Sequence, residues 1–493
     1  MLGRARCRLM TASAVLLALL AWQASAAAQS EEDEPTKDAE STASKASGTD
    51  ESPAKGTVAP PTTTFFERLG PETYPGQRRG ITDGSLSLEP TFHGLQWPQN
   101  TRTGIGVSGY SWIDSGHESI ARDKPGLPQY PNSSTFFQQG RGVLRVTPAY
   151  VDDGFFVQGQ IELVGSLCQA SSSVQALNPN LSCVNTGIST TDDLWVRVGR
   201  LNKWDVKVGR FQGWEVFHTG MALDPHTLER FGAGMFGVDT GTNPKLEVPT
   251  LYALNYLQDR SSDGMSVGYA AAHLYPTDFL RFEILAKLGN DNYKADTATG
   301  GSSSSYYGAR PTAILDLGWL KLKVGAEYEL RTPVTQVLAS EDGKKKDSAE
   351  KGTRSGVGGS VAIVAAPFVE FGVNAAVGKQ ENLDQYTMVI GQTSYTTTSL
   401  GGFANARVVP GVLIGVGADQ TTQKDRFIAP GSTVGDWVRQ LQGFGAVQYA
   451  MAHQFYVKAV FSYARADFQP SDVQSPIWHN TMLSGRVRLM YLF

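Results

Sequence analysis

The chain has 493 residues, a formal net charge of −4 and a mean hydropathy of −0.22. Charged residues make up 18% of it, below the roughly 25% of a typical soluble domain, whereas glycine occurs 53 times and aromatic residues make up 10%. After the N-terminus no apolar run approaches the ~18 residues that a membrane-spanning helix needs. The sequence also has no stripe of basic residues of the kind that binds nucleic acid. The composition therefore excludes a helical membrane protein and gives no support to nucleic-acid binding.

Residues 1–28 have the pattern of a secretory signal peptide. Arg4, Arg6 and Arg8 form a basic start, residues 15–20 are apolar, and small residues follow. Cleavage after Ala28 or after Ala26 would satisfy the small-residue rule. The chain is therefore expected to be exported.

Residues 29–64 carry eight acidic residues and three lysines, and they include no aromatic residue. Such a segment cannot bury enough apolar surface to offset the entropy of ordering, so we predict a disordered spacer. Binding to the cell wall or to a neighbouring protein is the alternative. Residues 65–102 are interrupted by prolines and are predicted to be an ordered lead-in to the strands that follow.

From Thr103 onward the residues alternate between apolar and polar, as in β-strands. Candidate strands are residues 103–113, 135–147, 154–165, 191–200, 204–213, 250–258, 264–274, 278–288, 305–316, 319–331, 353–365, 368–380, 398–408, 412–422, 438–449, 453–464 and 479–493. Most have about the length that a tilted strand needs to cross a membrane, and they exceed the roughly six residues usual in a soluble sandwich.

The connections between these strands alternate in length. Very short turns are predicted at Asn202, Pro276, Gly318, Pro367, Pro410 and Ala452. Long polar connections are predicted at residues 114–134, 166–190, 289–304, 332–352, 381–397, 423–437 and 465–478. Tight periplasmic turns and long extracellular loops are typical of outer-membrane barrels. The predicted fold of residues 103–493 is therefore an all-β, transmembrane antiparallel β-barrel of 16–18 strands.

The number of strands stays open at this point. The candidates number seventeen, whereas a bacterial single-chain barrel has an even number. Either residues 232–240 form an extra strand that pairs with 250–258, or residues 214–263 form one long loop that can fold into the lumen. Alternation in residues 232–239 slightly favours eighteen strands.

The C-terminal stretch, residues 482–493, alternates strictly, with Tyr491 and Phe493 on its apolar side. It resembles the last strand of outer-membrane β-barrel proteins. The resemblance implies that Tyr491 and Phe493 act as a signal to the barrel-assembly machinery and that this strand pairs with the first to close the barrel. An ordinary terminal strand of a soluble sandwich is the alternative.

Charged residues on the strands are expected to face the lumen, because Arg or Lys at the midplane of the lipid face would cost ~2–4 kcal/mol. The inward bases are predicted to be Arg141, Arg145, Arg197, Lys207, Arg281, Lys287, Lys321, Lys323, Arg407, Lys458, Arg486 and Arg488. The inward acids are predicted to be Glu162, Asp205, Glu283, Glu327, Glu329, Glu370 and Asp419. These charges either cancel in pairs or leave a positive field that favours anions. Gln138 is out of phase, which predicts a bulge or slip in its strand.

Residues 194–215 contain two similar segments, Val198-Gly199-Arg200 and Val208-Gly209-Arg210-Phe211. This stretch resembles the phosphate/pyrophosphate-selective porin family, in which such a strand precedes a loop that contains the constriction. The resemblance implies a trimeric outer-membrane channel with basic residues along its path.

Two of the three cysteines, Cys168 and Cys183, are placed in the predicted loop 166–190, and Cys7 leaves with the signal peptide. Extracellular cysteines favour a disulfide, so we predict that Cys168 and Cys183 are bonded. A metal site is the alternative, although neither a Cys-x-x-Cys motif nor clustered histidines accompany them. Residues 104–109 match Gly-x-Gly-x-x-Gly, but the βαβ context of a nucleotide site is lacking.

The sequence thus predicts a porin in the outer membrane of a Gram-negative bacterium, reached after signal-peptide cleavage. It would allow passive diffusion of small hydrophilic solutes, with a preference for phosphate-like anions, and would be neither an enzyme nor dependent on a metal or cofactor. Its expected partners are outer-membrane lipid, the solutes, the assembly machinery and two further copies in a homotrimer. A surface adhesin, a structural barrel and an outer-membrane hydrolase are the alternatives.

Overall fold

The structure is a computed structural model of the whole chain, which divides into two units, Met1–Thr62 and Thr63–Phe493. It describes residues 95–96, 102–123, 133–170, 187–189, 193–217, 267–293, 302–338, 346–381, 395–424, 437–452, 455–469 and 477–492. All of these belong to the second unit. The predicted signal peptide (1–28), the predicted disordered spacer (29–64) and most of the lead-in (65–102) lie outside the described residues.

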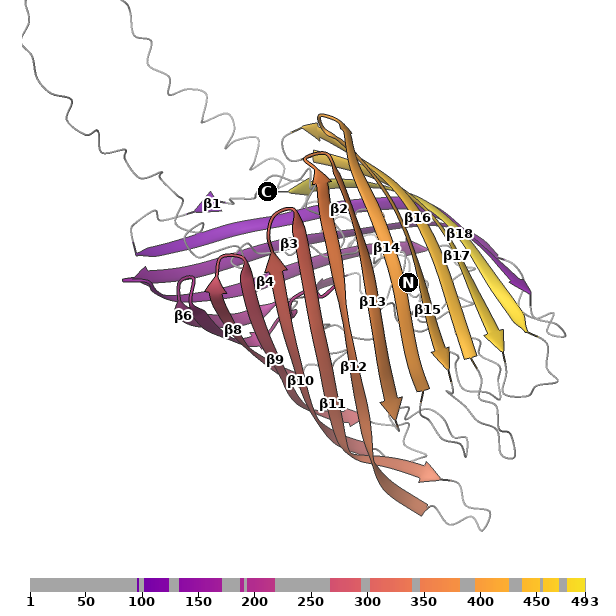
Figure 1. Ribbon diagram of the computed structural model, residues 1–493, viewed down its shortest axis with the longest axis horizontal. Coiled ribbons are helices and arrows are strands. Elements are labelled where there is room, and N and C mark those ends of the chain that lie inside the picture. Colours follow the sequence, from indigo (N-terminus) through magenta and orange to yellow (C-terminus); the bar gives the residue numbers. More distant parts are fainter. Residues whose placement is uncertain are drawn as a thin grey trace, which may run out of the picture. The chain divides into compact units, whose positions relative to one another are not determined.

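Sixteen antiparallel strands form a closed barrel, in which each strand pairs with the next and the last pairs with the first (Figure 1). The strands are β2 (Thr103–Asp123), β3 (Ser133–Asp152), β4 (Phe155–Ala170), β6 (Leu194–Arg200), β7 (Trp204–Arg210), β8 (Val267–Thr277), β9 (Leu280–Tyr293), β10 (Ser302–Asp316), β11 (Leu320–Leu338), β12 (Lys346–Ala366), β13 (Val369–Glu381), β14 (Tyr395–Val409), β15 (Val412–Lys424), β16 (Trp437–Ala452), β17 (Phe455–Gln469) and β18 (Trp478–Leu492). Two short strands add to this wall: β1 (Leu95–Gln96) pairs with β2, and β5 (Gly187–Ser189) pairs with β4.

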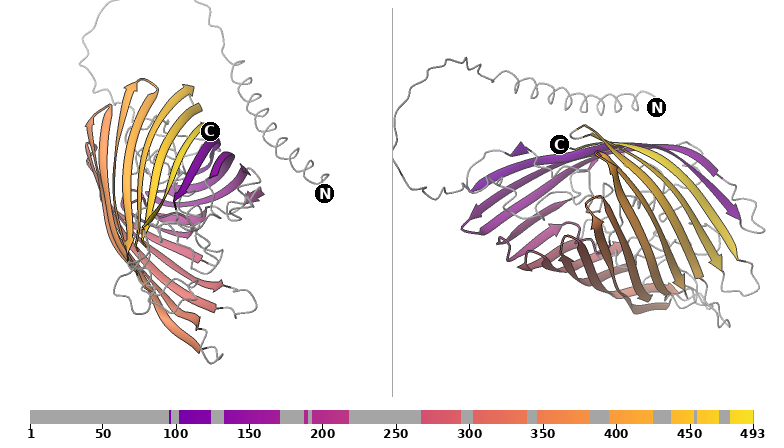
Figure 2. Two further views of the ribbon diagram at one scale, coloured as in Figure 1. Left: turned by 90° about the vertical axis from the view of Figure 1, so that its right-hand side faces the viewer. Right: turned by 45° about the horizontal axis from the view of Figure 1, so that its top comes forward.

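Closure of the barrel joins β18 to β2, the seam at which the yellow C-terminal strand lies beside the indigo one (Figure 2). The pairing runs without interruption from His479↔Asp123 to Leu492↔Tyr110. The predicted pairing of the C-terminal strand with the first barrel strand is confirmed. The alternating faces of β18 are also as predicted, because Leu483, Val487 and Leu489 are exposed whereas Arg486, Arg488 and Met490 are buried.

The barrel wall has sixteen strands rather than eighteen, because β7 pairs directly with β8 from Trp204↔Leu274 to Gly209↔Tyr269. Two further strands cannot lie between strands that are hydrogen-bonded to each other. The slight preference for a wall containing residues 232–240 and 250–258 was therefore wrong, and the alternative with one long connection is right. Those two segments themselves lie outside the described residues.

Many of the strands are longer than the sequence suggested, although β6 and β7 are shorter. β2 has 21 residues, about twice the length needed to cross the hydrocarbon layer, so residues 114–123 belong to a strand rather than to a loop. Its register with β3 has no shift from Thr103↔Tyr150 to Ile120↔Ser133, so the predicted bulge is wrong. Gln138 faces outward in a regular strand, and its amide donates to Ser115 Oγ over 3.3 Å.

The outer face of the barrel is apolar at alternate positions along the strands. On β15, for example, Val416 is 55% exposed whereas the neighbouring inward positions are buried or partly buried. Large aromatic residues are exposed where the short turns are, namely Tyr150, Phe155, Trp204, Phe279, Trp319, Phe368, Tyr449 and Phe455. An apolar band edged by aromatic residues is the surface of a transmembrane barrel.

The short turns depend on residues that accept a left-handed backbone. Asn202 has a φ of 56° between β6 and β7, and Gly318 has a φ of 80° between β10 and β11. At the opposite end of the barrel the strands are joined by longer connections, which lie largely outside the described residues. The short turns agree with the sequence, whereas the predicted long extracellular loops stay a prediction. In the described part of the chain no helix is long and apolar enough to span a membrane.

Candidate functional site

The interior of the barrel is the candidate functional site, because the polar half of each alternating strand points there. All twelve predicted inward bases lie at inward positions of their strands. Each either has more exposed residues directly before and after it or lies two residues from another buried side chain of the same strand. The wall is built so because each strand has one apolar and one polar face and only the apolar face can contact lipid. Their role as an anion path stays a prediction.

The closing seam carries a group of basic residues on β3, β17 and β18, the seam basic cluster, which consists of Arg141, Lys458, Arg486 and Arg488. Arg488 donates to Asp114 through Nε over 2.6 Å and through Nη2 over 2.8 Å, and Arg486 donates through Nη1 over 3.0 Å. Lys458 is the register partner of Arg488 on β17. Two of the four bases, Arg486 and Arg488, are thus hydrogen-bonded to Asp114 on β2, whereas Lys458 on β17 and Arg141 on β3 lie on the strands to either side.

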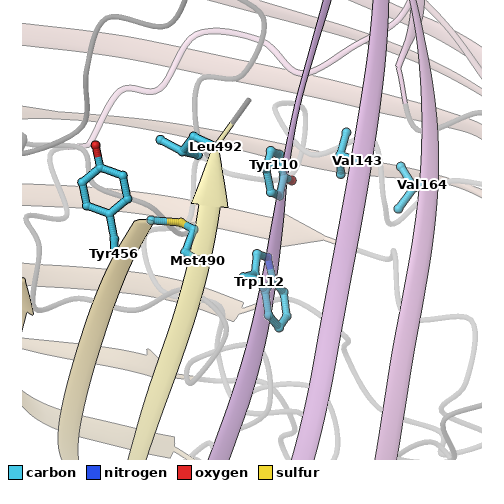
Figure 3. Close-up of a cluster of buried hydrophobic side chains, with 7 residues drawn as sticks. All are labelled: Tyr110, Trp112, Val143, Val164, Tyr456, Met490 and Leu492. Carbon is cyan, nitrogen blue, oxygen red and sulfur yellow. The ribbon is translucent and has the colours of Figure 1, made fainter. Parts of the chain in front are cut away.

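An apolar layer begins one inward position from Asp114 and Arg488, at Trp112 and Met490, toward the short turns. Figure 3 shows its side chains. The layer comprises Tyr110, Trp112, Val143, Val164, Tyr456, Met490 and Leu492, which come from both sides of the seam. The guanidinium carbon of Arg488 lies 4.1 Å from the centre of the Trp112 ring. The aromatic face and Asp114 together fix the direction of the Arg488 side chain.

Other predicted bases are paired with acids on the same wall. Arg145 forms an ion pair with Glu162, and Arg197 Nη2 lies 2.7 Å from Asp205 Oδ2. Lys321 Nζ lies 3.3 Å from Asp316 Oδ2 at the short-turn end of β10 and β11. These pairs reduce the net field of that part of the wall.

Two of the predicted lysines lie over aromatic rings. Lys207 Nζ is 4.3 Å from the ring centre of Trp195 and 4.4 Å from that of Phe211. Lys287 Nζ is 5.9 Å from the ring centre of Tyr269. The aromatic faces attract the two ammonium groups and hold them at the inner surface of the wall.

The chain enters the interior immediately after β7, through residues 211–217, which we call the inner segment. Trp214 N donates to Glu283 Oε1 over 2.9 Å, and Arg310 Nη1 donates to Trp214 O over 2.9 Å. Ser360 Oγ donates to Val216 O over 2.8 Å. Because these partners belong to β9, β10 and β12, the inner segment runs along the inside of the wall, as the sixteen-strand alternative allowed.

A histidine joins the inner segment to three strands. His273 on β8 has Nδ1 2.6 Å from Asp205 Oδ1 and Nε2 3.1 Å from Glu283 Oε2. Its ring is stacked on Trp214, with the ring centres 4.8 Å apart and the planes at 9°. An imidazole between two carboxylates can donate at both nitrogens when it is protonated. This arrangement holds the start of the inner segment against the wall.

The stretch that carries the family resemblance has a structural reason for one of its glycines. Gly209 has a φ of 136°, and a Cβ there would lie 2.3 Å from Leu194 O on β6. Only glycine permits this backbone conformation and this close approach. The phosphate-selective relationship itself stays a prediction.

Four residues of this interior were missed in the sequence. The sequence predicts a strand that ends at residue 113 and so places Asp114 in a loop, whereas β2 continues to Asp123. Arg310, Arg354 and His273 lie on predicted strands, where alternation indicates an inward side chain. Arg354 Nη1 is 3.7 Å from Glu329 Oε2. The alternation signal for these residues was present, but their partners were not visible.

The other predicted sites are only partly within the described residues. Tyr491 is the register partner of Ser111, and its ring centre is 4.5 Å from that of Phe455, whereas Phe493 lies outside the described residues. Cys168 pairs with Gln139 at the end of β4, so it lies in a strand rather than in the predicted loop. Cys183 lies outside the described residues, and the disulfide stays a prediction. Over the described ranges, no group of three or more His, Cys, Asp or Glu side chains could hold a metal ion.

Comparisons with known proteins find similarity only among solved structures. No protein-family profile matches the chain, and no curated protein matches its sequence. The outer membrane channel DcaP of Acinetobacter baumannii is 9% identical, with a TM-score of 0.46 over 82% of this chain and 100% of that one. The anion-selective porin from Comamonas acidovorans is 10% identical, with a TM-score of 0.45 over 79% and 100%. OmpT of Vibrio cholerae, in a trimer form, is 14% identical, with a TM-score of 0.44 over 79% and 99%. These values are too low to carry a function to this chain.

Proposed function

We propose that this protein is a passive diffusion channel for small hydrophilic solutes in the outer membrane of a Gram-negative bacterium. The observation that carries the proposal is the alternation of apolar outward and polar inward side chains around a closed wall of sixteen strands. Barrels of 16–18 strands are wide enough to leave an aqueous channel. The inner segment narrows that channel from one side, because it lies inside the wall rather than across its mouth.

The channel is also proposed to prefer anions, phosphate-like ones included, and to assemble as a homotrimer. Support for the anion preference comes from the seam basic cluster, in which four bases lie on three strands and only two of them, Arg486 and Arg488, share the carboxylate of Asp114. In the ring of sixteen strands, β10 lies eight strands from β18, and β11 lies eight strands from β2, so each is on the opposite side of the barrel. The seam basic cluster therefore faces the part of the wall along which the inner segment runs. A ring or arc of Arg and Lys lowers the barrier for an anion that sheds water in a constriction.

Single-channel recording in a planar bilayer tests this function. With a KCl gradient, we expect discrete current steps and a reversal potential that favours chloride. Neutralisation of Lys458 and Arg141 to glutamine should shift that potential toward potassium, whereas Lys379→Gln, whose side chain is 58% exposed on the outer face, should not. Phosphate added to chloride should lower the chloride current by competition.

The outcomes separate the parts of the proposal. A reversal potential that favours potassium would rule out the anion preference but keep the channel. Absence of current steps from correctly folded protein would rule out the channel and leave the adhesin, structural and hydrolase alternatives. A trimer should give current steps in groups of three. Isolated single steps, together with the mass of a monomer in detergent, would contradict the trimer.

A further inference from the structure

The inner wall formed by β14, β15 and β16 differs from the seam basic cluster in its chemistry. Asp419 on β15 is 2% exposed, and within the described part of the chain neither of its carboxylate oxygens has a hydrogen-bond partner. Its register partners are Gly401 on β14 and Gln442 on β16, neither of which is charged. A buried carboxylate without a partner is costly, because a charge removed from water needs compensation.

The basic residues of the neighbouring strands do not lie at the level of Asp419 along the barrel wall. Lys458 on β17 is opposite Gln448, and Arg407 on β14 is opposite Leu413, both toward the short turns. Arg354 on β12 donates to Gln380, toward the long connections. Glu370 on β13 accepts from the amide of Asn405 over 2.7 Å and is thus hydrogen-bonded, unlike Asp419.

The uncompensated groups around Asp419 are mainly acceptors. Among the described residues, the amide oxygens of Gln423 and Gln440 lack a donor, as do the two oxygens of Asp419, while Nε2 of Gln442 lacks an acceptor. Nearer the short turns, both amide atoms of Gln448 lack a partner. An ammonium, amidinium or guanidinium group offers only donors, a hydroxylated solute offers both donors and acceptors, and an anion offers acceptors. The surplus of acceptors therefore favours a cation that donates hydrogen bonds.

Two aromatic rings lie one inward position below Asp419. In the register, Phe403 on β14 and Phe444 on β16 both pair with Gly417 on β15, and both are buried at inward positions. Glycine between them leaves the wall without a side chain at that point. An apolar or aromatic body could therefore contact the rings while its charged group reaches Asp419.

We propose that Asp419, Gln440 and Gln442, together with Phe403 and Phe444, form a binding subsite for organic cations that combine an amidinium, guanidinium or ammonium group with an apolar body. This subsite, the Asp419 subsite, rests on the proposed channel function. The Asp419 subsite adds organic cations to the solutes of the proposed channel. Such cations bind transiently to β14, β15 and β16 as they pass through the lumen.

Block of the single-channel current by three isosteric probes tests the subsite in the full-length wild-type protein. Benzamidinium is a cation, benzamide is neutral and benzoate is an anion of nearly the same shape. Because a charge-assisted hydrogen bond contributes ~1.5–3 kcal/mol, benzamidinium should bind at least about tenfold more tightly than benzamide. Equal block by benzamidinium and benzamide, or stronger block by benzoate or glucose, would overturn the proposal.

Asp419→Asn keeps the shape and removes the charge, so it should reduce the preference for benzamidinium over benzamide to within about twofold. The matched control is Glu370→Gln, which neutralises a partnered carboxylate on β13 and should keep the preference. Phe444→Leu should weaken the block by both probes, and unchanged block would remove the aromatic part of the site. If the wild-type protein gives no current, the channel function fails; if current flows and benzamidinium does not block it, only the subsite fails.

Discussion

At the scale of single residues, Asp114 connects the first and last strands of the barrel. Its carboxylate accepts hydrogen bonds from Arg486 and Arg488, and all three side chains are buried. Two guanidinium groups side by side repel each other unless a negative charge lies between them. The same residues therefore close the barrel and supply the positive charge of the seam basic cluster.

Asp114→Ala should lower the free energy of unfolding by about 3–5 kcal/mol, because it leaves two buried guanidinium groups without their shared carboxylate. Urea unfolding of the protein in liposomes would measure this change. Ser115→Ala on the outward face of the same strand is the control and should change stability by less than about 0.5 kcal/mol. Equal effects of the two substitutions would show that the charge network is not needed for stability.

At the scale of elements, the inner segment occupies part of the barrel interior along β9, β10 and β12. Its buried side chains, Phe211, Trp214, Val216 and Phe217, pack against the wall while backbone groups of Trp214 and Val216 are hydrogen-bonded to it. A segment held at several points along its length should remain in place during conduction.

A cysteine pair tests this arrangement directly. A Cβ at Gly325 on β11 would lie 2.9 Å from Val216 Cγ2, so cysteines at 216 and 325 should be close enough for a disulfide. We expect Val216→Cys with Gly325→Cys to cross-link on mild oxidation, as read by mass spectrometry, with little change in conductance. The control pair is Val216→Cys with Gly443→Cys, since a Cβ at the outward position 443 meets nothing within 4 Å. A large fall in conductance on cross-linking of the first pair would mean that the segment normally moves away from the wall.

At the scale of the whole molecule, the outer face must meet lipid over an apolar band and water beyond it. On β15, the outward positions change from Val416 and Ala418 to Gln420 and Thr422, which marks the edge of the band. On β11 and β17, exposed Tyr328 and Tyr463 lie about one membrane-crossing length from the aromatic residues near the short turns.

Val416→Arg should therefore destabilise the protein in liposomes by about 2–4 kcal/mol, because it places a charge in the apolar band. Gln420→Arg, on the same face of the same strand, should cost at most about 1 kcal/mol, since that position lies near the interface. Unfolding by urea in lipid vesicles would compare the two. Similar small costs at both positions would contradict a transmembrane location for β15.

Several features were predictable from the sequence because they are local. Alternation with a period of two assigned the inward face of Arg486 and Arg488, and turn residues such as Asn202 and Gly318 marked the short connections. Strand ends were less certain, because polar residues such as Ser115 and Gln138 on the outer face look like loop residues once a strand extends beyond the membrane. This is why Asp114 was assigned to a loop.

The sequence by itself determined an antiparallel barrel with an apolar outside and a polar inside, because alternation within each strand and short turns between strands are local features. The closing role of the C-terminal strand followed from its resemblance to the last strand of outer-membrane barrels. The tertiary structure decided the number of wall strands, the partners of the inward charges and the course of the inner segment. The register of each strand against its neighbours sets which side chains meet at one level of the wall. It brings Asp114 to Arg488 across 374 positions of the chain and leaves Asp419 without a base at its own level, and no periodicity within a strand encodes either arrangement.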